Sequence, residues 1–290
     1  MSGRPPRRPS PLPRALDDPP GQRFIGGRDL TAWPSLPGRV IVRFALRLRG
    51  WLAPHQVLAA ILAVGLIVVA LLVVAAAGVY DAVTESDGVA GLDQPVLRFA
   101  ETLRSPLTNT LVGTYTLLGG AVLLPVLVAA AAIGMAVRWR RWTPIVLTAA
   151  TAAGSLTLTG VGKAVVGRAR PPVIDAVPPY ELSASFPSGH SLNSAALATV
   201  LAYLLLRGEH SIHTRVLTVA LAAAFTVGIG LSRVYLGAHW LTDVLVAWAL
   251  GLAWATVVII GHRLFLTLRR STRTNDDAAE PNDNTDRTRE

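Results

Sequence analysis

Two long stretches of this chain contain no charged residue, and they limit the kinds of fold it can adopt. Residues 57–80 and 107–137 lack Asp, Glu, Lys and Arg throughout. A helix needs about 20 apolar residues to cross a hydrocarbon core of about 30 Å, whereas a surface helix of a soluble protein keeps a polar face. Because 51% of the residues are hydrophobic and the mean hydropathy is +0.46, the sequence indicates an integral membrane protein.

We expect an all-α fold, a bundle of six membrane-spanning helices. The predicted spans are residues 57–80, 108–137, 143–163, 189–206, 215–233 and 239–262. Gly119, Gly120 and Pro125 lie within the long second span, so a kink or tilt is expected there. The third span is rich in Thr, Ala and Gly, and small residues allow close helix packing in lipid. This span is therefore expected inside the bundle.

The composition divides the chain into four regions, which are 1–37, 38–54, 55–265 and 266–290. The first is rich in Pro and Arg and the last is polar and charged, so both are expected to be disordered cytoplasmic tails. The first region also lacks the apolar stretch of a cleavable signal peptide. The third region is the predicted membrane domain.

Residues 38–54 are predicted to form an amphipathic segment at the membrane surface. On a helical wheel three arginines gather on one side and four apolar residues on the other, namely Arg39, Arg43 and Arg47 opposite Ile41, Phe44, Leu48 and Leu52. Such a helix can lie in the headgroup layer with its arginines toward anionic lipid. A simple juxtamembrane extension fits the same pattern.

The positive charge of the chain predicts its orientation in the membrane. The formal net charge is +9, and the arginines lie mainly near the two ends and in short loops between apolar stretches. By the positive-inside rule both termini are cytoplasmic, and the ends of the first, third and fifth spans face outward. This distribution does not favour nucleic-acid binding. Because the chain has no cysteine, it forms no disulfide and no thiolate metal site.

Three polar segments interrupt the apolar pattern, and all map to the predicted outer side: residues 163–171, 187–190 and 232–243. They supply groups suited to holding a phosphate, which are Lys163, Arg170, Arg233, Ser188 and Gly189. Ionisable groups at membrane depth are costly and usually functional. Arginines grip phosphate oxygens in pairs, and the start of a helix presents free backbone N–H groups to an anion. The sequence therefore predicts a phosphate site.

The same segments contain the groups needed for covalent phosphoryl transfer. His239 and Asp243 are four residues apart, hence on one face of a helix and able to touch. The carboxylate would fix the imidazole tautomer and leave the other nitrogen as a nucleophile, while His190 would protonate the departing oxygen. This chemistry requires no metal and no cofactor. Taken singly, these residues also fit a helix cap, headgroup anchors and a structural hydrogen bond.

The three segments resemble the motifs of the type 2 phosphatidic acid phosphatase (PAP2) superfamily. The motifs K-x6-R-P, P-S-G-H and S-R-x5-H-x3-D are complete, in order, within residues 143–262. The resemblance implies a helical core like that of the superfamily, which includes the soluble vanadium-dependent haloperoxidases. It also implies that Lys163, Arg170, Ser188, Gly189 and Arg233 bind phosphate, that His190 is the acid, His239 the nucleophile and Asp243 its partner. Arg168, inside the first motif, is expected to be a secondary phosphate contact. The six spans argue against the haloperoxidase branch.

The leading hypothesis is a phosphatase for a lipid phosphate or diphosphate in the membrane. Polyprenyl diphosphate, phosphatidylglycerol phosphate and phosphatidic acid are all candidate substrates. The alternative is a lipid-phosphate-binding or transporter-like membrane protein without activity, but mere binding does not require a histidine with a carboxylate partner. Tyr180 and Glu181 are expected at the substrate entrance, and His210 and His213 in a solvated cytoplasmic loop.

Overall fold

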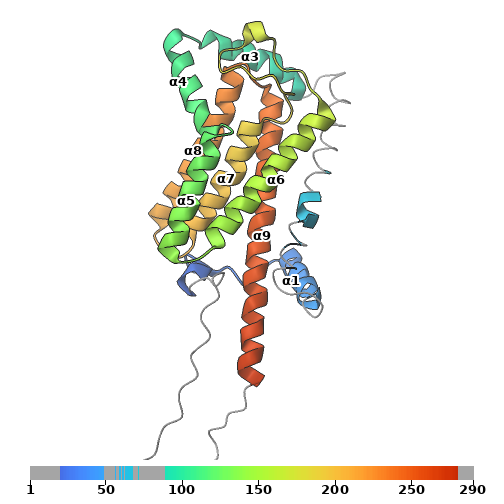
Figure 1. Cartoon of the computed structure of the whole chain (residues 1–290), viewed down its shortest axis with the longest axis vertical. Helices are drawn as coiled ribbons and strands as arrows, with labels where there is room; N and C mark the ends of the chain where they lie inside the picture. Colours follow the sequence, from blue (N-terminus) through green and yellow to red (C-terminus); the bar gives the residue numbers. More distant parts are fainter. Residues whose placement is uncertain are drawn as a thin grey trace, which may run out of the picture.

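The computed structural model describes residues 20–48, scattered positions between 56 and 71, and residues 89–279. The described chain is an elongated bundle of helices, with one helix, α9 (Leu241–Ala279), extending beyond the others at one end (Figure 1). The only strands among these residues are β1 (Phe24–Ile25) and β2 (Arg28–Asp29), which pair as a short antiparallel hairpin outside the bundle. The all-α prediction is confirmed.

Within the described residues, four helices are long and apolar enough to cross a membrane, and they correspond to the last four predicted spans. They are α6 (Thr143–Val166), α7 (Gly189–Leu206), α8 (Ile212–Tyr235) and residues Leu241–Arg270 of α9. Ser188 and Ser211 cap α7 and α8, each accepting a hydrogen bond from a backbone N–H in the first turn. The Ser211 cap explains why α8 begins at Ile212, three residues before the start predicted from hydropathy.

The second predicted span is a broken helix, as its glycines indicated. It consists of α4 (Pro106–Thr116), the short 3₁₀ turn η3 (Leu117–Gly119) and α5 (Leu123–Trp139), with a bend of 49° at the break. Counting this pair as one span gives five among the described residues. The first predicted span, 57–80, falls largely outside the described residues, so the total of six stays a prediction.

Helix α7 occupies the centre of the bundle and packs against α6, α8 and α9. Glycines allow this close approach. A Cβ at Gly251 of α9 would lie 2.6 Å from the backbone oxygen of Leu192 in α7, and the ring of Trp254 covers Gly154 of α6. The sequence pointed to α6 as an interior helix, but α7 is the more buried, with 56% of its span inside the protein against 44% for α6.

One end of the bundle is covered by short elements (Figure 1). They are η2 (Val89–Leu92), α3 (Asp93–Thr102) and the segment between α6 and α7, which contains the 3₁₀ turn η4 (Val173–Asp175). Helix α3 lies across this end, and its Leu97 and Ala100 are buried. The three polar segments singled out in the sequence meet directly beneath this cover.

At the opposite end, parts of both regions predicted as tails have defined structure. Residues 20–35, including η1 (Pro20–Arg23) and the hairpin, bind the bundle through Gly26 N to Glu209 O (3.0 Å) and Arg263 Nε to Leu30 O (2.8 Å). Helix α9 continues past 266 to Ala279 because Leu264 and Leu268 pack against this N-terminal part. Sequence composition alone did not indicate these contacts.

The predicted amphipathic segment contains a helix, α1 (Leu36–Leu48). Its Val40, Ile41 and Phe44 are exposed, whereas Val42 packs against the apolar cluster around Leu264. An exposed apolar face beside arginines suits a helix in the headgroup layer, so this location stays our prediction. Residues 49–54 of the predicted segment, like 1–19 and 280–290 of the tails, lie outside the described residues.

Candidate active site

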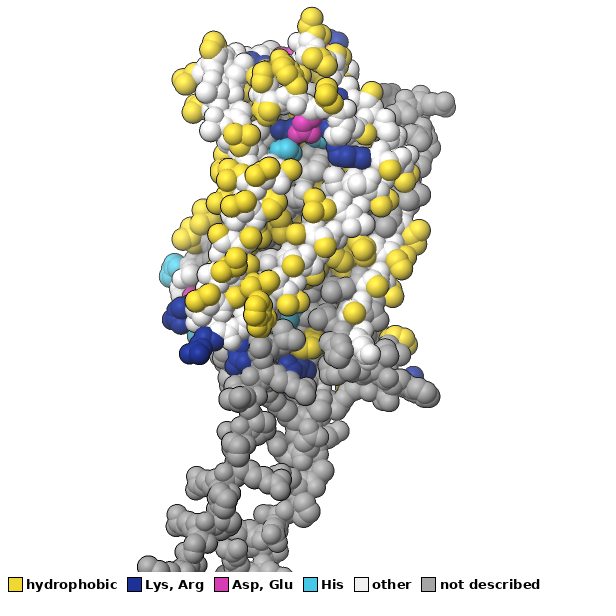
Figure 2. Space-filling model, in the orientation of Figure 1, with side chains coloured by type: hydrophobic (Ala, Val, Ile, Leu, Met, Phe, Trp, Pro, Cys, Tyr) yellow, Lys and Arg dark blue, Asp and Glu magenta, His cyan; other side chains and the backbone are white. Residues whose placement is uncertain are grey.

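The predicted site residues come from six parts of the chain that meet at the covered end of the bundle. Lys163 lies in the last turn of α6, Arg170 in the segment after it, and His190 in the first turn of α7. Arg233 lies in the last turn of α8, His239 in the turn between α8 and α9, and Asp243 in the first turn of α9. Figure 2 shows an acidic side chain among histidine and basic side chains at this end, above a flank rich in hydrophobic side chains.

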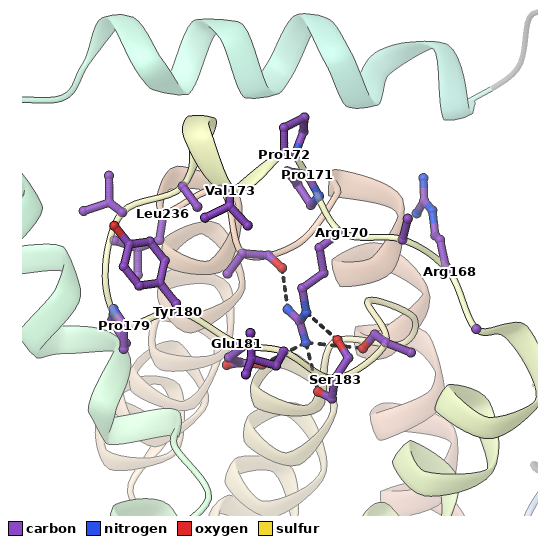
Figure 3. A pocket seen from close by; sticks show the side chains of 18 residues that line it. Arg168, Arg170, Pro171, Pro172, Val173, Pro179, Tyr180, Glu181, Ser183 and Leu236 are labelled. Carbon is purple, nitrogen blue, oxygen red and sulfur yellow. Dashed lines mark hydrogen bonds and ion pairs between the residues drawn. The ribbon is translucent and has the colours of Figure 1, made fainter.

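The carboxylate of Glu181 lies at the centre of the cluster. Arg170 Nη2 donates to its Oε2 (2.9 Å), and Arg233 Nη2 donates to its Oε1. His190 Nδ1 is 3.5 Å from Oε1, and His239 Nε2 is 3.9 Å from Oε2. Figure 3 shows Arg170 and Glu181 pointing toward each other. A single anionic group thus contacts or faces four of the side chains that the sequence assigned to phosphate chemistry.

The charges around Glu181 keep it ionised. Burial raises the pKa of its carboxyl, but the guanidiniums of Arg233 and Arg170 help to hold that pKa below its usual value. The Arg233 side chain is completely buried, and its Nε has no hydrogen-bond partner among the described residues. A buried donor of this kind is costly unless it meets an acceptor. The cluster therefore has the properties of an anion-binding site.

His239 presents one nitrogen to the anion and the other to Asp243. Arg170 Nη1 donates to His239 Nε2 at 3.1 Å. Because a guanidinium cannot accept, Nε2 is the acceptor and carries no proton, which leaves the ring proton on Nδ1. The other nitrogen, Nδ1, is 3.6 Å from Asp243 Oδ2. Burial lowers the pKa of His239 to about 4 against the raising effect of Asp243, so the imidazole is neutral at pH 7.

The pairing of His239 with Asp243 differs in one respect from the expectation. The two do not share a helix face, because α9 begins only at Leu241 and His239 lies in the preceding turn. They meet because the Asp243 side chain turns back toward the preceding residues, where its Oδ2 accepts a hydrogen bond from Trp240 N at 3.0 Å. Gly237 makes this turn possible, since its φ is +65° and a Cβ there would collide with the backbone oxygen of Asp175.

Lys163, Ser188 and Gly189 surround the site without contacting the Glu181 carboxylate directly. Lys163 Nζ donates to Ser183 Oγ (2.7 Å) and Ala184 O (2.8 Å), and so fixes the segment that carries Glu181. Ser188 is buried as the cap of α7, and its backbone N donates to Asp243 O (3.3 Å). Gly189 sits close to Thr159, where a Cβ would be 3.2 Å from its methyl group. Phosphate contacts from these three residues stay predictions.

Arg168 has a different position from the one expected of a phosphate contact. Its guanidinium donates to Asp93 and Asp243, and in Figure 3 it points away from Arg170 and Glu181. Tyr180 is 58% exposed in a cavity of about 730 Å³ formed by the covering segment, whereas Glu181 reaches inward from the same segment. The sequence motifs gave no signal for Asp93 or for Ser185, a buried residue whose Oγ donates to Asp243 Oδ2 at 2.5 Å.

Metal binding has no visible basis in the described part of the chain. No group of three or more His, Asp or Glu side chains gathers there in a way that would hold an ion. His210 lies in the loop between α7 and α8 and His213 in the first turn of α8, at the end of the bundle opposite the site.

A cluster of cations and histidines around one anionic group, at one end of a multi-pass helical bundle, is the arrangement expected of a membrane phosphatase. Comparison with known proteins identifies the family to which this phosphatase belongs. Residues 142–265 match the family model described as the PAP2 superfamily. The chain belongs to this superfamily and is a phosphatase.

Similar proteins come from two bacteria. The chain is 33% identical over 173 residues to phosphatidylglycerophosphatase B of Bacillus subtilis (strain 168), covering 59% of this chain and 83% of that protein. It also resembles the crystal structure of a transmembrane PAP2-type phosphatidylglycerolphosphate phosphatase from Bacillus subtilis, with a TM-score of 0.57 and 27% identity over 75% of this chain and 97% of that one. Aquifex aeolicus LpxE gives a TM-score of 0.41 with 23% identity, over 58% of this chain and 94% of that one.

The position of Glu181 leads to a prediction about substrate affinity. A phosphate that binds to Arg170 and Arg233 has to displace the carboxylate from them. Glu181→Gln removes the competing charge, so we expect KM, and the Ki for inorganic phosphate, to fall by about five- to tenfold, which is 1–1.4 kcal/mol, with kcat retained. Steady-state kinetics with phosphate as product inhibitor measure both constants.

Asp175→Asn is the matched control for this variant. It removes the same charge from the same segment, in η4, where Asp175 contributes its backbone oxygen to Arg104 (2.7 Å). We expect wild-type KM and Ki from it. An unchanged KM in Glu181→Gln, or a KM that rises while kcat falls, would contradict competition between the carboxylate and the substrate.

Proposed function

We propose that the protein removes a phosphate group from a lipid-linked phosphate or diphosphate through a phosphohistidine intermediate on His239. The observation that carries this proposal is the set of contacts around Glu181. A phosphoryl group in place of that carboxylate would be held by Arg170 and Arg233 and would lie beside Nε2 of His239 and Nδ1 of His190. These are the electrostatic clamp, the nucleophile and the acid that phosphoryl transfer needs.

The first step forms the covalent intermediate. The Nε2 lone pair of His239 attacks phosphorus, and the bond from phosphorus to the lipid oxygen breaks with its electron pair on that oxygen. The imidazolium of His190 gives this oxygen a proton, so the lipid alcohol leaves. Arg170 and Arg233 stabilise the negative charge on the phosphoryl oxygens. Asp243 stabilises the positive charge that develops on the His239 ring.

The second step returns the enzyme to its starting state. His190, now neutral, takes a proton from water while the water oxygen attacks phosphorus. The bond between phosphorus and Nε2 breaks, its electron pair returns to His239, and inorganic phosphate is released. His190 is protonated again, so it serves as acid in one step and base in the next.

A lipid substrate suits the location of the cluster at one end of the membrane bundle, where a phosphate can enter while its tail stays in the leaflet. We propose phosphatidylglycerol phosphate as the first substrate to test, because the Bacillus subtilis relative is named a phosphatidylglycerophosphatase. Polyprenyl diphosphate and phosphatidic acid are the other candidates. The site lies at the end opposite the docked N-terminal hairpin and the end of α9 (Figure 1), which supports cytoplasmic termini and an outward-facing site.

A panel of lipid phosphates tests the proposal. Purified protein in detergent with EDTA is expected to release inorganic phosphate from phosphatidylglycerol phosphate, and a water-soluble short-chain lipid phosphate is expected to be hydrolysed outside intact cells that express the protein. Failure to release phosphate from every member of the panel would favour the non-catalytic binding or transport alternative. Activity on the short-chain compound only after cell lysis would place the site on the cytoplasmic side.

A further inference from the structure

A buried chain of charges connects the outer helix α3 to the nucleophile. It runs from Asp93, the first residue of α3, through Arg168 to Asp243, which faces His239. Asp93 is 4% exposed and Asp243 is completely buried. Asp93 and Asp243 are each 75 residues from Arg168 in the sequence, so only the tertiary fold brings the three together.

Asp93 supplies the cap for the start of α9 from a different helix. Its Oδ1 accepts from the backbone N of Thr242 at 2.9 Å, and its Oδ2 accepts from Thr242 Oγ1 at 2.7 Å. The first N–H groups of a helix have no partner within the helix and need an outside acceptor. The carboxylate of α3 thus fixes the first turn of α9, the turn that carries Asp243.

Arg168 lies between two carboxylates. It donates from Nη2 to Asp93 Oδ2 (2.7 Å) and from Nη1 to Asp243 Oδ1 (2.5 Å). The other oxygen of Asp243 accepts from Ser185 Oγ and Trp240 N. With both oxygens engaged, the Asp243 carboxylate cannot rotate freely, and Oδ2 stays on the side of His239 Nδ1.

Sharing Arg168 between two carboxylates also affects the charge that His239 experiences. With Asp243 alone as its partner, the guanidinium would neutralise that carboxylate. Because Arg168 also pairs with Asp93, the two carboxylates and one guanidinium keep a net charge of −1 beside the imidazole. A negative group at this place stabilises the cationic ring that forms on phosphorylation.

We propose that Asp93 and Arg168 are positioning residues for the phosphatase reaction, acting on His239 through Asp243. The inference rests on the proposed function, since it concerns the nucleophile assigned there. It gives α3 a part in catalysis and assigns Arg168 to orientation of the nucleophile rather than to phosphate binding.

The variant Asp93→Asn tests the inference. Asparagine keeps an oxygen for Thr242 N, so the cap of α9 is retained, but the negative charge beside Arg168 is lost. Removing an outer partner of a functional side chain typically costs 10–100-fold in activity, and we expect a fall in kcat of about 10–100-fold, with KM and the Ki for inorganic phosphate unchanged. Glu101→Gln, in the same helix α3 but outside the charge chain, is the matched control and is expected to behave as wild type.

A second pair of variants separates positioning from a merely structural role. Arg168→Lys keeps one cation and is expected to retain more kcat than Arg168→Gln, both at unchanged KM. The fraction of molecules that form phosphohistidine in a single turnover is measured for each. A role in stability alone would lower that fraction and leave the rate per competent molecule unchanged, which would overturn the inference, as would wild-type kcat in Asp93→Asn.

His239→Ala, measured alongside, separates a failure of the proposed nucleophile from a failure of the positioning role alone. If it keeps activity, the proposed nucleophile is wrong and this inference fails with it. If it is inactive while Asp93→Asn and Arg168→Gln match the wild type, only the positioning role is refuted.

Discussion

Replacement of His239 by alanine is expected to lower kcat by about 10⁴- to 10⁶-fold, the range seen when the nucleophile of a covalent mechanism is removed. The nitrogen that faces the Glu181 carboxylate, Nε2, is the one that we propose attacks phosphorus. Its ring is neutral at pH 7 because burial lowers the pKa of His239 to about 4. Alanine provides no atom that can take over the covalent step.

The measurement is phosphate release from the lipid panel together with the amount of phosphorylated protein after a single turnover. Both should vanish in His239→Ala, while expression, membrane insertion and thermal stability in detergent remain. His213→Ala changes the same residue type in the first turn of α8, at the opposite end of the bundle, and serves as the control with full activity. Near-normal turnover in His239→Ala would rule out the nucleophile assignment.

Replacement of His190 is expected to have the second-largest effect, and its size should depend on the leaving group. Removal of a general acid costs about 10²–10⁴-fold. His190 Nδ1 lies 3.5 Å from Glu181 Oε1, across the same anion from His239. A lipid alcohol is a poor leaving group that needs this proton, whereas the p-nitrophenolate ion departs without it.

His190→Ala is therefore expected to lose most of its activity on lipid phosphates and far less on p-nitrophenyl phosphate. The level of phosphohistidine with the activated substrate should rise in this variant, because His190 also assists the water in the second step. Equal losses on both kinds of substrate would contradict the role of His190 as acid and indicate a part in binding.

The sequence indicated which side chains gather at one end of the bundle, because the motifs record residue types at short, fixed spacings. Arg170, His190, Arg233 and His239 meet around one carboxylate, as the motifs implied. The sequence indicated Glu181 only as a residue of the substrate entrance, because a glutamate in a loop does not reveal which cations the fold will bring to it. Glu181 reaches the arginines only because Lys163 holds the neighbouring Ser183 and Ala184 in place.

Contacts over long distances in the chain explain the remaining differences. Asp93 is in a short polar helix with nothing in its local sequence to indicate burial, and only the packing of α3 across the bundle brings it to Thr242. Hydropathy located four later spans but not their ends, which caps such as Ser211 determine. It also ended α9 too early, because Leu264 and Leu268 are buried by an N-terminal segment that composition alone marked as a tail.

The carboxylate between Arg170 and Arg233 also bears on how this protein can exist before it meets any lipid. Two guanidiniums forced together away from water would repel each other and resist folding. Because the covering segment contributes both Arg170 and Glu181, the chain carries a built-in counter-ion for its cations. Insertion and assembly of the bundle can then proceed without help from phosphate in the surroundings.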